Sequence, residues 1–127
     1  MLADHTPIPT LGTADLPRAR EFYEGTLGFT PGPDAPEGVL YQAGSSSFLV
    51  YPSGFAGTNK ATAMSFTVST DEFDEVVADL RGRGVTFLSF DLPVGSWVDG
   101  VADFGNGMKG VWFTDPDGNI LNVDAMG

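Results

Sequence analysis

The chain has 127 residues, of which 42% are hydrophobic and 18% charged, a composition typical of one globular domain with no room for a second full core. Its 17 acidic and 6 basic residues leave a formal charge of −11, which disfavours nucleic acids and anionic membranes as partners and favours cationic ligands. The absence of cysteine excludes disulfides, thiolate catalysis and sulfur-ligated metals. The longest apolar runs have only the length of a strand, so the sequence predicts no membrane-spanning helix, and we expect a cytoplasmic location.

The first half of the chain reads as a strand, a helix and three further strands. The helix is predicted from Leu16 to about Leu27, because Asp15 can cap its free amides and apolar residues recur at spacings of three and four. Gly28 follows where a left-handed residue commonly ends a helix. Extended segments are expected at 8–13 before this helix, and at 29–30, 38–43 and 47–51 after it.

The second half repeats this order with a displacement of roughly 56 residues. A helix is predicted from Ser69 to Gly82, because the spacing of Ser69 and Glu72 allows reciprocal capping. Strands are expected at 62–68, 85–89, 108–114 and 119–125, with a tight turn at 115–118. Residues 90–107 are predicted to form a long glycine-bearing loop, and ordered loops of this length are often functional.

The repeat predicts an α+β fold in one domain over residues 1–127. The domain would contain two βαβββ modules, at about 7–52 and 61–126, joined by a linker at about 53–60 that is rich in turn-forming residues.

Two motifs resemble those of a known family. The segment 15–29 resembles the D-L-x-x-A-x-x-F-Y-x-x-x-L-G-F segment of the vicinal oxygen chelate superfamily, and 115–119 resembles its D-P-D-G-N hairpin. This superfamily includes glyoxalase I, extradiol dioxygenases and bleomycin-resistance proteins. The resemblance implies that each module is a curled mixed sheet with a helix on its outer face, that the modules enclose a cleft, and that the chain forms a homodimer.

The same resemblance implies a divalent metal held by four side chains, typically His or Gln, Glu, His and Glu. The corresponding positions in this chain are occupied by Ile8, Leu49, Ala63 and Asn122. The first three side chains have no lone pair, and a neutral amide alone binds divalent ions weakly. We therefore expect neither a metal nor another cofactor, and the usual enzymology of the family does not follow from its fold.

Strand alternation predicts which side chains line the expected cleft. Its candidate ligand-binding residues come from both modules and from the loop at 90–107. They are Leu49, Tyr51, Ala63, Ser65, Trp97, Phe104, Trp112, Asn122 and Asp124. Trp97 lies between Gly95 and Gly100 and is expected to act as a mobile lid, whereas Trp112 could equally be part of the core.

These observations predict a metal-free small-molecule binding protein of the bleomycin-resistance type, with an aromatic or cationic ligand. One alternative is a glyoxalase-like lyase, isomerase or dioxygenase that uses a displaced metal site or acid–base residues such as Asp124. Another is a scaffold or regulatory dimer that does not use its cleft. The sequence does not name the ligand.

Overall fold

The computed structural model describes residues 1–33 and 38–126, and the chain divides into two compact units. The first unit is Met1–Ala63 together with Pro116–Asn119, and the second is Met64–Asp115 together with Ile120–Gly127. The expected α+β class is confirmed, since a three-stranded and a five-stranded sheet are accompanied by few helices. Among the described residues, no helix has the length and apolar character needed to cross a membrane.

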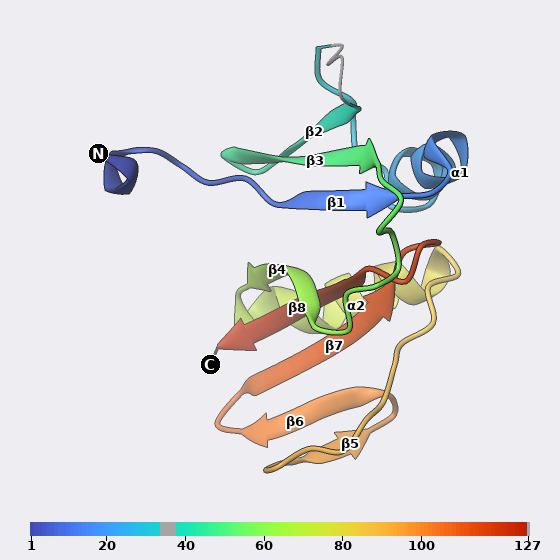
Figure 1. The fold of residues 1–127 in the computed structure, drawn as a ribbon. Coiled ribbons are helices and arrows are strands. Elements are labelled where there is room, and N and C mark those ends of the chain that lie inside the picture. The colour runs from blue at the N-terminus through green and yellow to red at the C-terminus, as the bar shows by residue number, and fades with distance from the viewer. Residues whose placement is uncertain (34–37, 127) are drawn as a thin grey trace. The chain divides into compact units, whose positions relative to one another are not determined.

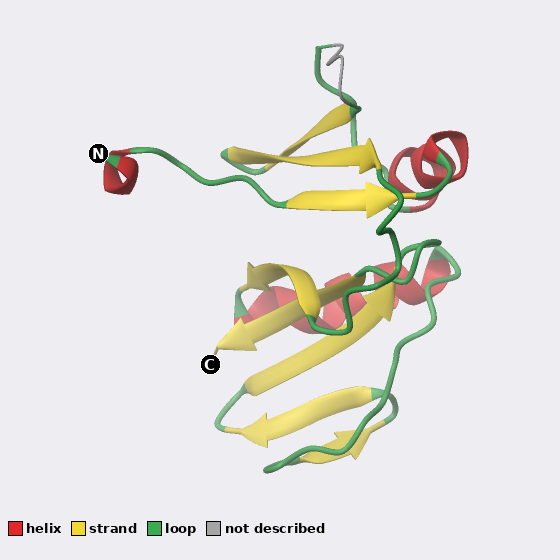
Figure 2. Ribbon diagram, viewed as in Figure 1, coloured by secondary structure: helices red, strands yellow, loops and turns green. Residues whose placement is uncertain are grey.

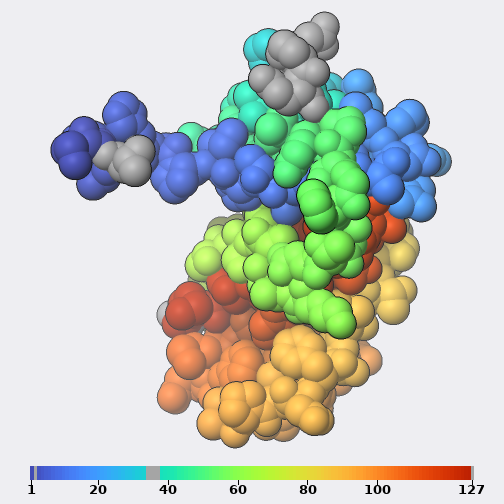
Figure 3. Space-filling view, in the orientation of Figure 1, coloured from blue at the N-terminus to red at the C-terminus, as the bar shows by residue number. Residues whose placement is uncertain are grey.

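The first unit contains a three-stranded sheet in the order β1-β3-β2 (Figure 1). Strand β1 (Thr10–Thr13) runs parallel to β3 (Ser46–Pro52), and β2 (Val39–Ala43) is antiparallel to β3. A short 3₁₀ turn, Leu2–Asp4, lies in the N-terminal segment, which extends away from this sheet (Figure 3). One face of the sheet is buried and carries the core of the unit, which includes Tyr23, Tyr41 and Phe48.

Helix α1 (Leu16–Arg20) begins where the sequence predicted. The Asp15 carboxylate accepts a hydrogen bond of 3.1 Å from the Arg18 amide, and Gly28 has a φ of 81°. The prediction of one α-helix to Leu27 is wrong in its last turns, because the segment Glu21–Thr26 is π-helical. This segment places Tyr23 in the core, where its ring lies 5.5 Å from Phe48 and 5.7 Å from Tyr41 between ring centroids. Aromatic packing therefore accompanies the change in helix type.

The π-helical segment also carries a charged contact with the core. Glu24 accepts hydrogen bonds from Arg20 Nε at 2.7 Å and from the Tyr41 hydroxyl at 2.8 Å. The hydrogen bond from Arg20, reinforced by that from Tyr41, holds the pKa of Glu24 below its ordinary value against the opposing effect of burial. Burial, followed by the hydrogen bond to Glu24, raises the pKa of Tyr41.

This arrangement gives the first prediction. Because the pKa of Glu24 is lowered in the folded state, its ionised form contributes stability above the ordinary pKa of 4.5, and this contribution disappears as the pH falls through the folded-state pKa. We expect Glu24→Gln to lower the free energy of unfolding by about 0.5 kcal/mol at pH 7, and by less at pH 3. Urea unfolding at both pH values measures the difference, and an equal loss at both would contradict the role of the carboxylate.

The second unit contains a five-stranded sheet in the order β4-β8-β7-β6-β5. Its strands are β4 (Thr62–Val68), β5 (Ser96–Val98), β6 (Val101–Gly105), β7 (Met108–Thr114) and β8 (Ile120–Met126). Helix α2 (Thr70–Gly82) lies along one side of this sheet (Figure 2). The predicted capping is confirmed, since the Ser69 hydroxyl accepts from the Glu72 amide at 3.2 Å and donates to the Glu72 carboxylate at 3.1 Å.

Two predicted strands are absent from the described residues. The segment 29–30 is not a strand, and only an isolated bridge between Pro31 and Tyr41 lies beside β2. The segment 85–89 is not a strand either, although the Leu88 amide donates to the Trp112 carbonyl at 2.7 Å. Beside the bridge to Tyr41, the Gly32 amide donates to the Leu40 carbonyl at 2.6 Å, whereas Pro31 has no amide hydrogen to contribute to a regular ladder.

The predicted loop at 90–107 is also a correction, because it contains the β5–β6 hairpin. The connection is Asp99-Gly100, whose φ angles are 51° and 77°, and Val98 pairs with Val101 across it. Two-residue turns of this kind need positive φ at both positions, and Asp-Gly is among the sequences that favour them. The sequence therefore held a hairpin signal that the loop prediction overlooked.

Candidate functional site

The five-stranded sheet of the second unit has two unlike faces. Side chains on one face, including Val111, Phe113 and Leu121, are buried on the side of α2, which itself buries Phe73 and Val77. Because side chains alternate along a strand, the neighbouring positions point away from α2. We call this second surface the far face, and define it by Trp97, Ala102, Gly110, Trp112, Asn122 and Asp124.

The strand register fixes the order of these residues. Trp97 pairs with Ala102, Ala102 with Gly110, and Gly110 with Asp124, so that one row crosses four strands. In the next row, Trp112 pairs with Asn122. The middle of the first row thus has only the small residues Ala102 and Gly110 between a tryptophan and a carboxylate.

Gly110 is needed because the Trp112 ring lies directly over it. A Cβ atom at Gly110 would stand 3.1 Å from Trp112 Cη2 and 3.2 Å from Cζ3. These distances are shorter than ordinary van der Waals contact between carbon atoms. The missing side chain of Gly110 therefore allows the indole of Trp112 to lie along the sheet.

Three rings form an aromatic cluster, which we define as Phe90, Trp97 and Trp112. Phe90 stands edge-to-face with Trp97 and with Trp112, at centroid distances of 5.3 and 5.0 Å, and the two indoles are 6.2 Å apart. The Trp97 indole also donates to the Phe90 carbonyl at 2.8 Å. Phe90 is 46% exposed, so the cluster reaches the surface of the unit. Aromatic surfaces of this kind stack on planar or cationic ligands.

The two polar residues of β8 on the far face differ in their bonding. Asn122 is 4% exposed, and its side-chain nitrogen donates to the carbonyls of Val111 at 3.1 Å and Val123 at 3.4 Å. Asp124 Oδ1 is buried and has no hydrogen-bond partner among the described residues. A buried acceptor without a donor costs free energy, particularly when it is charged. Asp124 therefore offers a position where a donor from a ligand would be favourable.

The structure brings together Trp97, Trp112, Asn122 and Asp124 on the far face, and it adds Phe90, which the sequence reasoning did not select. Trp97 lies in the middle of the edge strand β5 and not in a loop, so its predicted position is wrong, while its role as a lid stays a prediction. Phe104 lies on β6, where Cδ1 of its ring is 3.0 Å from the point where a Cβ atom of Gly95 would stand, and it is outside the aromatic cluster.

The other predicted residues lie on different strands. Leu49 and Tyr51 are half-buried on β3 in the first unit, paired with Thr10 and Gly12. Ala63 and Ser65 alternate on β4 with the buried Met64, with Ala63 half-buried and Ser65 exposed. Their assignment to a ligand site stays a prediction.

The residues at the family's four metal-ligand positions do not fit a metal. Ile8 precedes β1 and is 41% exposed, while Leu49 and Ala63 offer only hydrocarbon. The fourth position, Asn122, directs its amide nitrogen to carbonyls of its own sheet. Within residues 1–33 and 38–126, no group of three or more His, Asp or Glu side chains is placed to hold a metal ion. The donor chemistry required for tight binding of a transition metal is therefore missing.

We accordingly expect less than one bound nickel, zinc, iron or manganese ion per chain after purification without chelator. Elemental analysis by mass spectrometry measures this content. One tightly bound ion per chain, retained through dialysis, would contradict the expectation.

A groove of about 300 Å³ lies on the α2 side of the same sheet. Four of its charged residues form two ion pairs, with Lys109 Nζ 3.7 Å from Asp74 Oδ1 and Arg81 Nη1 3.5 Å from Asp99 Oδ2, while Asp103 Oδ1 accepts from the Gly105 amide at 2.9 Å. Arg81 also lies over the Phe87 ring at 5.4 Å from its centroid. These pairs satisfy one another, so the groove is a weaker candidate than the far face.

Comparison with known proteins agrees with this fold. The model of the Glyoxalase/Bleomycin resistance protein/Dioxygenase superfamily matches residues 4–123. No curated protein matches the sequence.

Solved structures with similar folds come from several bacteria. Lactoylglutathione lyase from Agrobacterium tumefaciens is 18% identical with a TM-score of 0.70, over 96% of this chain and 93% of that one. A glyoxalase/bleomycin resistance protein/dioxygenase from Alicyclobacillus acidocaldarius is 15% identical with a TM-score of 0.72, over 96% and 91%. The fosfomycin resistance protein FosX from Mesorhizobium loti is 12% identical with a TM-score of 0.66, over 98% and 93%. At these identities the likeness shows the fold alone.

Proposed function

Because the chain belongs to the glyoxalase/bleomycin resistance protein/dioxygenase superfamily, we propose that it binds a small molecule without a metal, as a protein of the bleomycin-resistance type. The ligand is aromatic and cationic, and it binds on the far face of the second unit. A homodimer is part of the same proposal.

One observation carries the proposal, namely the buried Asp124 Oδ1 that has no partner among the described residues. It lies in the row that ends at Trp97, and its strand neighbour Gly110 lies under the Trp112 ring. An anionic acceptor next to aromatic faces suits a ligand with a protonated nitrogen and a flat apolar part. The formal charge of −11 attracts such a ligand at long range.

The same carboxylate favours one alternative. An unpaired carboxylate in a partly desolvated setting could accept a proton from a bound substrate, as a metal-free lyase or isomerase would require. The two functions differ in their outcome, because a binding protein returns its ligand unchanged. Mass spectrometry of a recovered ligand after long incubation separates them.

The proposal predicts the effect of removing the outer wall of the aromatic cluster. Trp97→Ala should weaken the binding of an aromatic cation by about 1–2 kcal/mol, which is the range for aromatic and cation–π contacts. Affinity should also fall as salt increases, because exposed charges are screened over about 8–10 Å at physiological ionic strength. Titration followed by the fluorescence of the remaining Trp112 measures both effects in this variant.

Phe55→Ala provides the matched control. Phe55 is 81% exposed in the first unit, outside the aromatic cluster, so its removal should leave the affinity unchanged. Equal affinities of the Trp97→Ala variant and the parent chain, with no dependence on salt, would contradict the proposed function.

A further inference from the structure

The far face contains a slot that the protein fills with its own side chain. Gly110 and Ala102 are neighbours on β7 and β6, and Ala102 is fully buried. The outer edge of the Trp112 indole stands 3.1–3.2 Å from the position that a Gly110 Cβ would occupy. Neighbouring strands are about 4.8 Å apart, so the two small residues make a floor about as wide as one aromatic ring. Trp112 thus occupies a space shaped for a flat ring.

Two polar groups around this slot have no hydrogen-bond partner among the described residues. Asp124, the strand partner of Gly110, has the buried and unpaired Oδ1. Among the described residues, the Trp112 indole N–H also has no acceptor, whereas the Trp97 indole donates to the Phe90 carbonyl. The Trp112 ring is therefore held by packing alone. The carboxylate oxygen beside it has lost water without gaining a donor, so a ligand that supplies a donor would lower the free energy of this site.

We propose that the slot over Gly110 is a binding site for a planar aromatic cation that displaces the edge of the Trp112 ring and donates a hydrogen bond from a nitrogen of a ring-attached group to Asp124 Oδ1. This inference rests on the proposed function and names the ligand class and the moving residue. Paired residues on adjacent strands are about 5 Å apart, so a nitrogen of a group attached to a ring over Gly110 reaches the carboxylate. Trp112 moves aside and becomes a wall of the site.

Three small probes separate charge from ring shape. Benzamidine is a flat aromatic cation, benzamide is its neutral isostere, and acetamidinium has the cation without the ring. The chain has only two tryptophans, so a ¹⁵N-labelled sample gives two indole N–H signals, which Trp97→Phe assigns. We expect benzamidine to shift the Trp112 signal and to bind about tenfold more tightly than either other probe.

Two variants test the slot and the carboxylate. Asp124→Asn should abolish the preference for benzamidine over benzamide, because the neutral side chain no longer attracts the cation. Gly110→Ala places a methyl group in the slot and should weaken the binding of benzamidine by about tenfold. Gly82→Ala is the matched control, since no atom lies within 4 Å of the added carbon there. The indole spectra also report whether each variant is folded.

The outcomes separate this inference from the proposed function. Three outcomes would each overturn the proposal of a binding slot over Gly110. They are equal binding of benzamidine and benzamide, an indole signal of Trp112 that does not shift, and unchanged binding of benzamidine in the Gly110→Ala variant. If another aromatic cation then bound with dependence on Trp97, the proposed function would stand without it. If a screen of aromatic cations gave no binding that depended on Trp97 or Asp124, both proposals would fail.

Discussion

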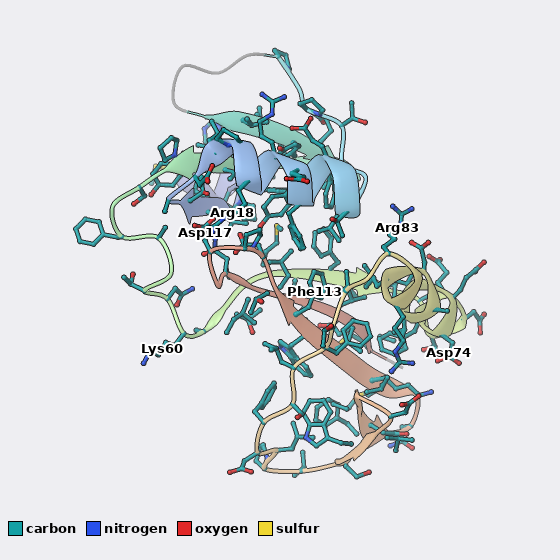
Figure 4. All side chains as sticks on the ribbon, turned by 90° about the vertical axis from the view of Figure 1, so that its right-hand side faces the viewer. Arg18, Lys60, Asp74, Arg83, Phe113 and Asp117 are labelled. Atoms are coloured by element: carbon teal, nitrogen blue, oxygen red, sulfur yellow. The ribbon has the colours of Figure 1, made fainter. Side chains whose placement is uncertain are left out.

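Asp117→Ala is expected to lower the free energy of unfolding by about 3 kcal/mol, because it removes a buried carboxylate that accepts hydrogen bonds from Thr13, Ala14 and Arg18. The side chain of Asp117 is 3% exposed. Its oxygens accept hydrogen bonds from the Thr13 hydroxyl at 2.6 Å, the Ala14 amide at 2.9 Å and Arg18 Nη2 at 3.2 Å. Figure 4 labels Arg18 and Asp117 next to each other. Thr13 is fully buried, and without Asp117 its hydroxyl would keep only the Asp15 carbonyl, 3.0 Å away, as an acceptor among the described residues.

The measurement is urea unfolding at pH 7, with Asp79→Ala as the control. Asp79 accepts from Arg83 Nε at 2.9 Å on the surface of α2, with 61% of its side chain exposed, and such a pair contributes about 0.5 kcal/mol or less. Asp117→Asn keeps the size of the side chain, and its loss of unfolding free energy should be about half of that in Asp117→Ala. Similar losses in the Asp117 and Asp79 alanine variants would show that the buried contacts contribute little.

These contacts explain why the family resemblance predicted the fold and not the chemistry. Asp117 belongs to the second motif, and it bonds to residues at the start of the first motif, beside Asp15. Asn119, from the same turn, donates to the Gly12 carbonyl at 2.9 Å. In this chain the first motif and residues 116–119 of the second are structural parts of the first unit, so their presence says nothing about a reaction.

Local signals predicted most of the fold because they need little tertiary information. Ser69 and Glu72 cap α2 through contacts three residues apart, and strand alternation placed Leu121 and Val123 on the helix side. The π-helical turn at Glu21–Thr26 could not be predicted in this way, since it accompanies the packing of Tyr23 among distant rings. The β5–β6 hairpin could have been predicted from Asp99-Gly100.

The candidate site was predictable only in part. Alternation along β8 placed Asn122 and Asp124 on one face, and the cross-strand partner Trp112 followed from the sheet. Phe90 joins the aromatic cluster because the chain before it passes beside β7, where the Leu88 amide bonds to the Trp112 carbonyl. That path depends on tertiary contacts that no local pattern encodes. The different bonding of Asn122 and Asp124, two residues apart, likewise appears only when neighbouring strands are in place.

The unpaired oxygen of Asp124 gives the second large expected effect, an increase in stability at the expense of binding. Asp124→Asn should raise the free energy of unfolding by about 1 kcal/mol, because it removes the negative charge of a half-buried carboxylate whose buried Oδ1 has no donor among the described residues. Residues kept for binding commonly destabilise the free protein, and replacing them often stabilises it. Thermal and urea unfolding without ligand measure the gain, and titration with an aromatic cation measures the loss of affinity.

Asp91→Asn is the control for this prediction, because it makes the same change in net charge at an exposed position. Its free energy of unfolding should change by no more than about 0.5 kcal/mol. A similar gain in both variants would assign the effect to the net charge of −11 and not to the buried oxygen. A loss of stability in Asp124→Asn alone would show that the carboxylate supports the fold, and the argument that its unpaired oxygen awaits a ligand would then lose its basis.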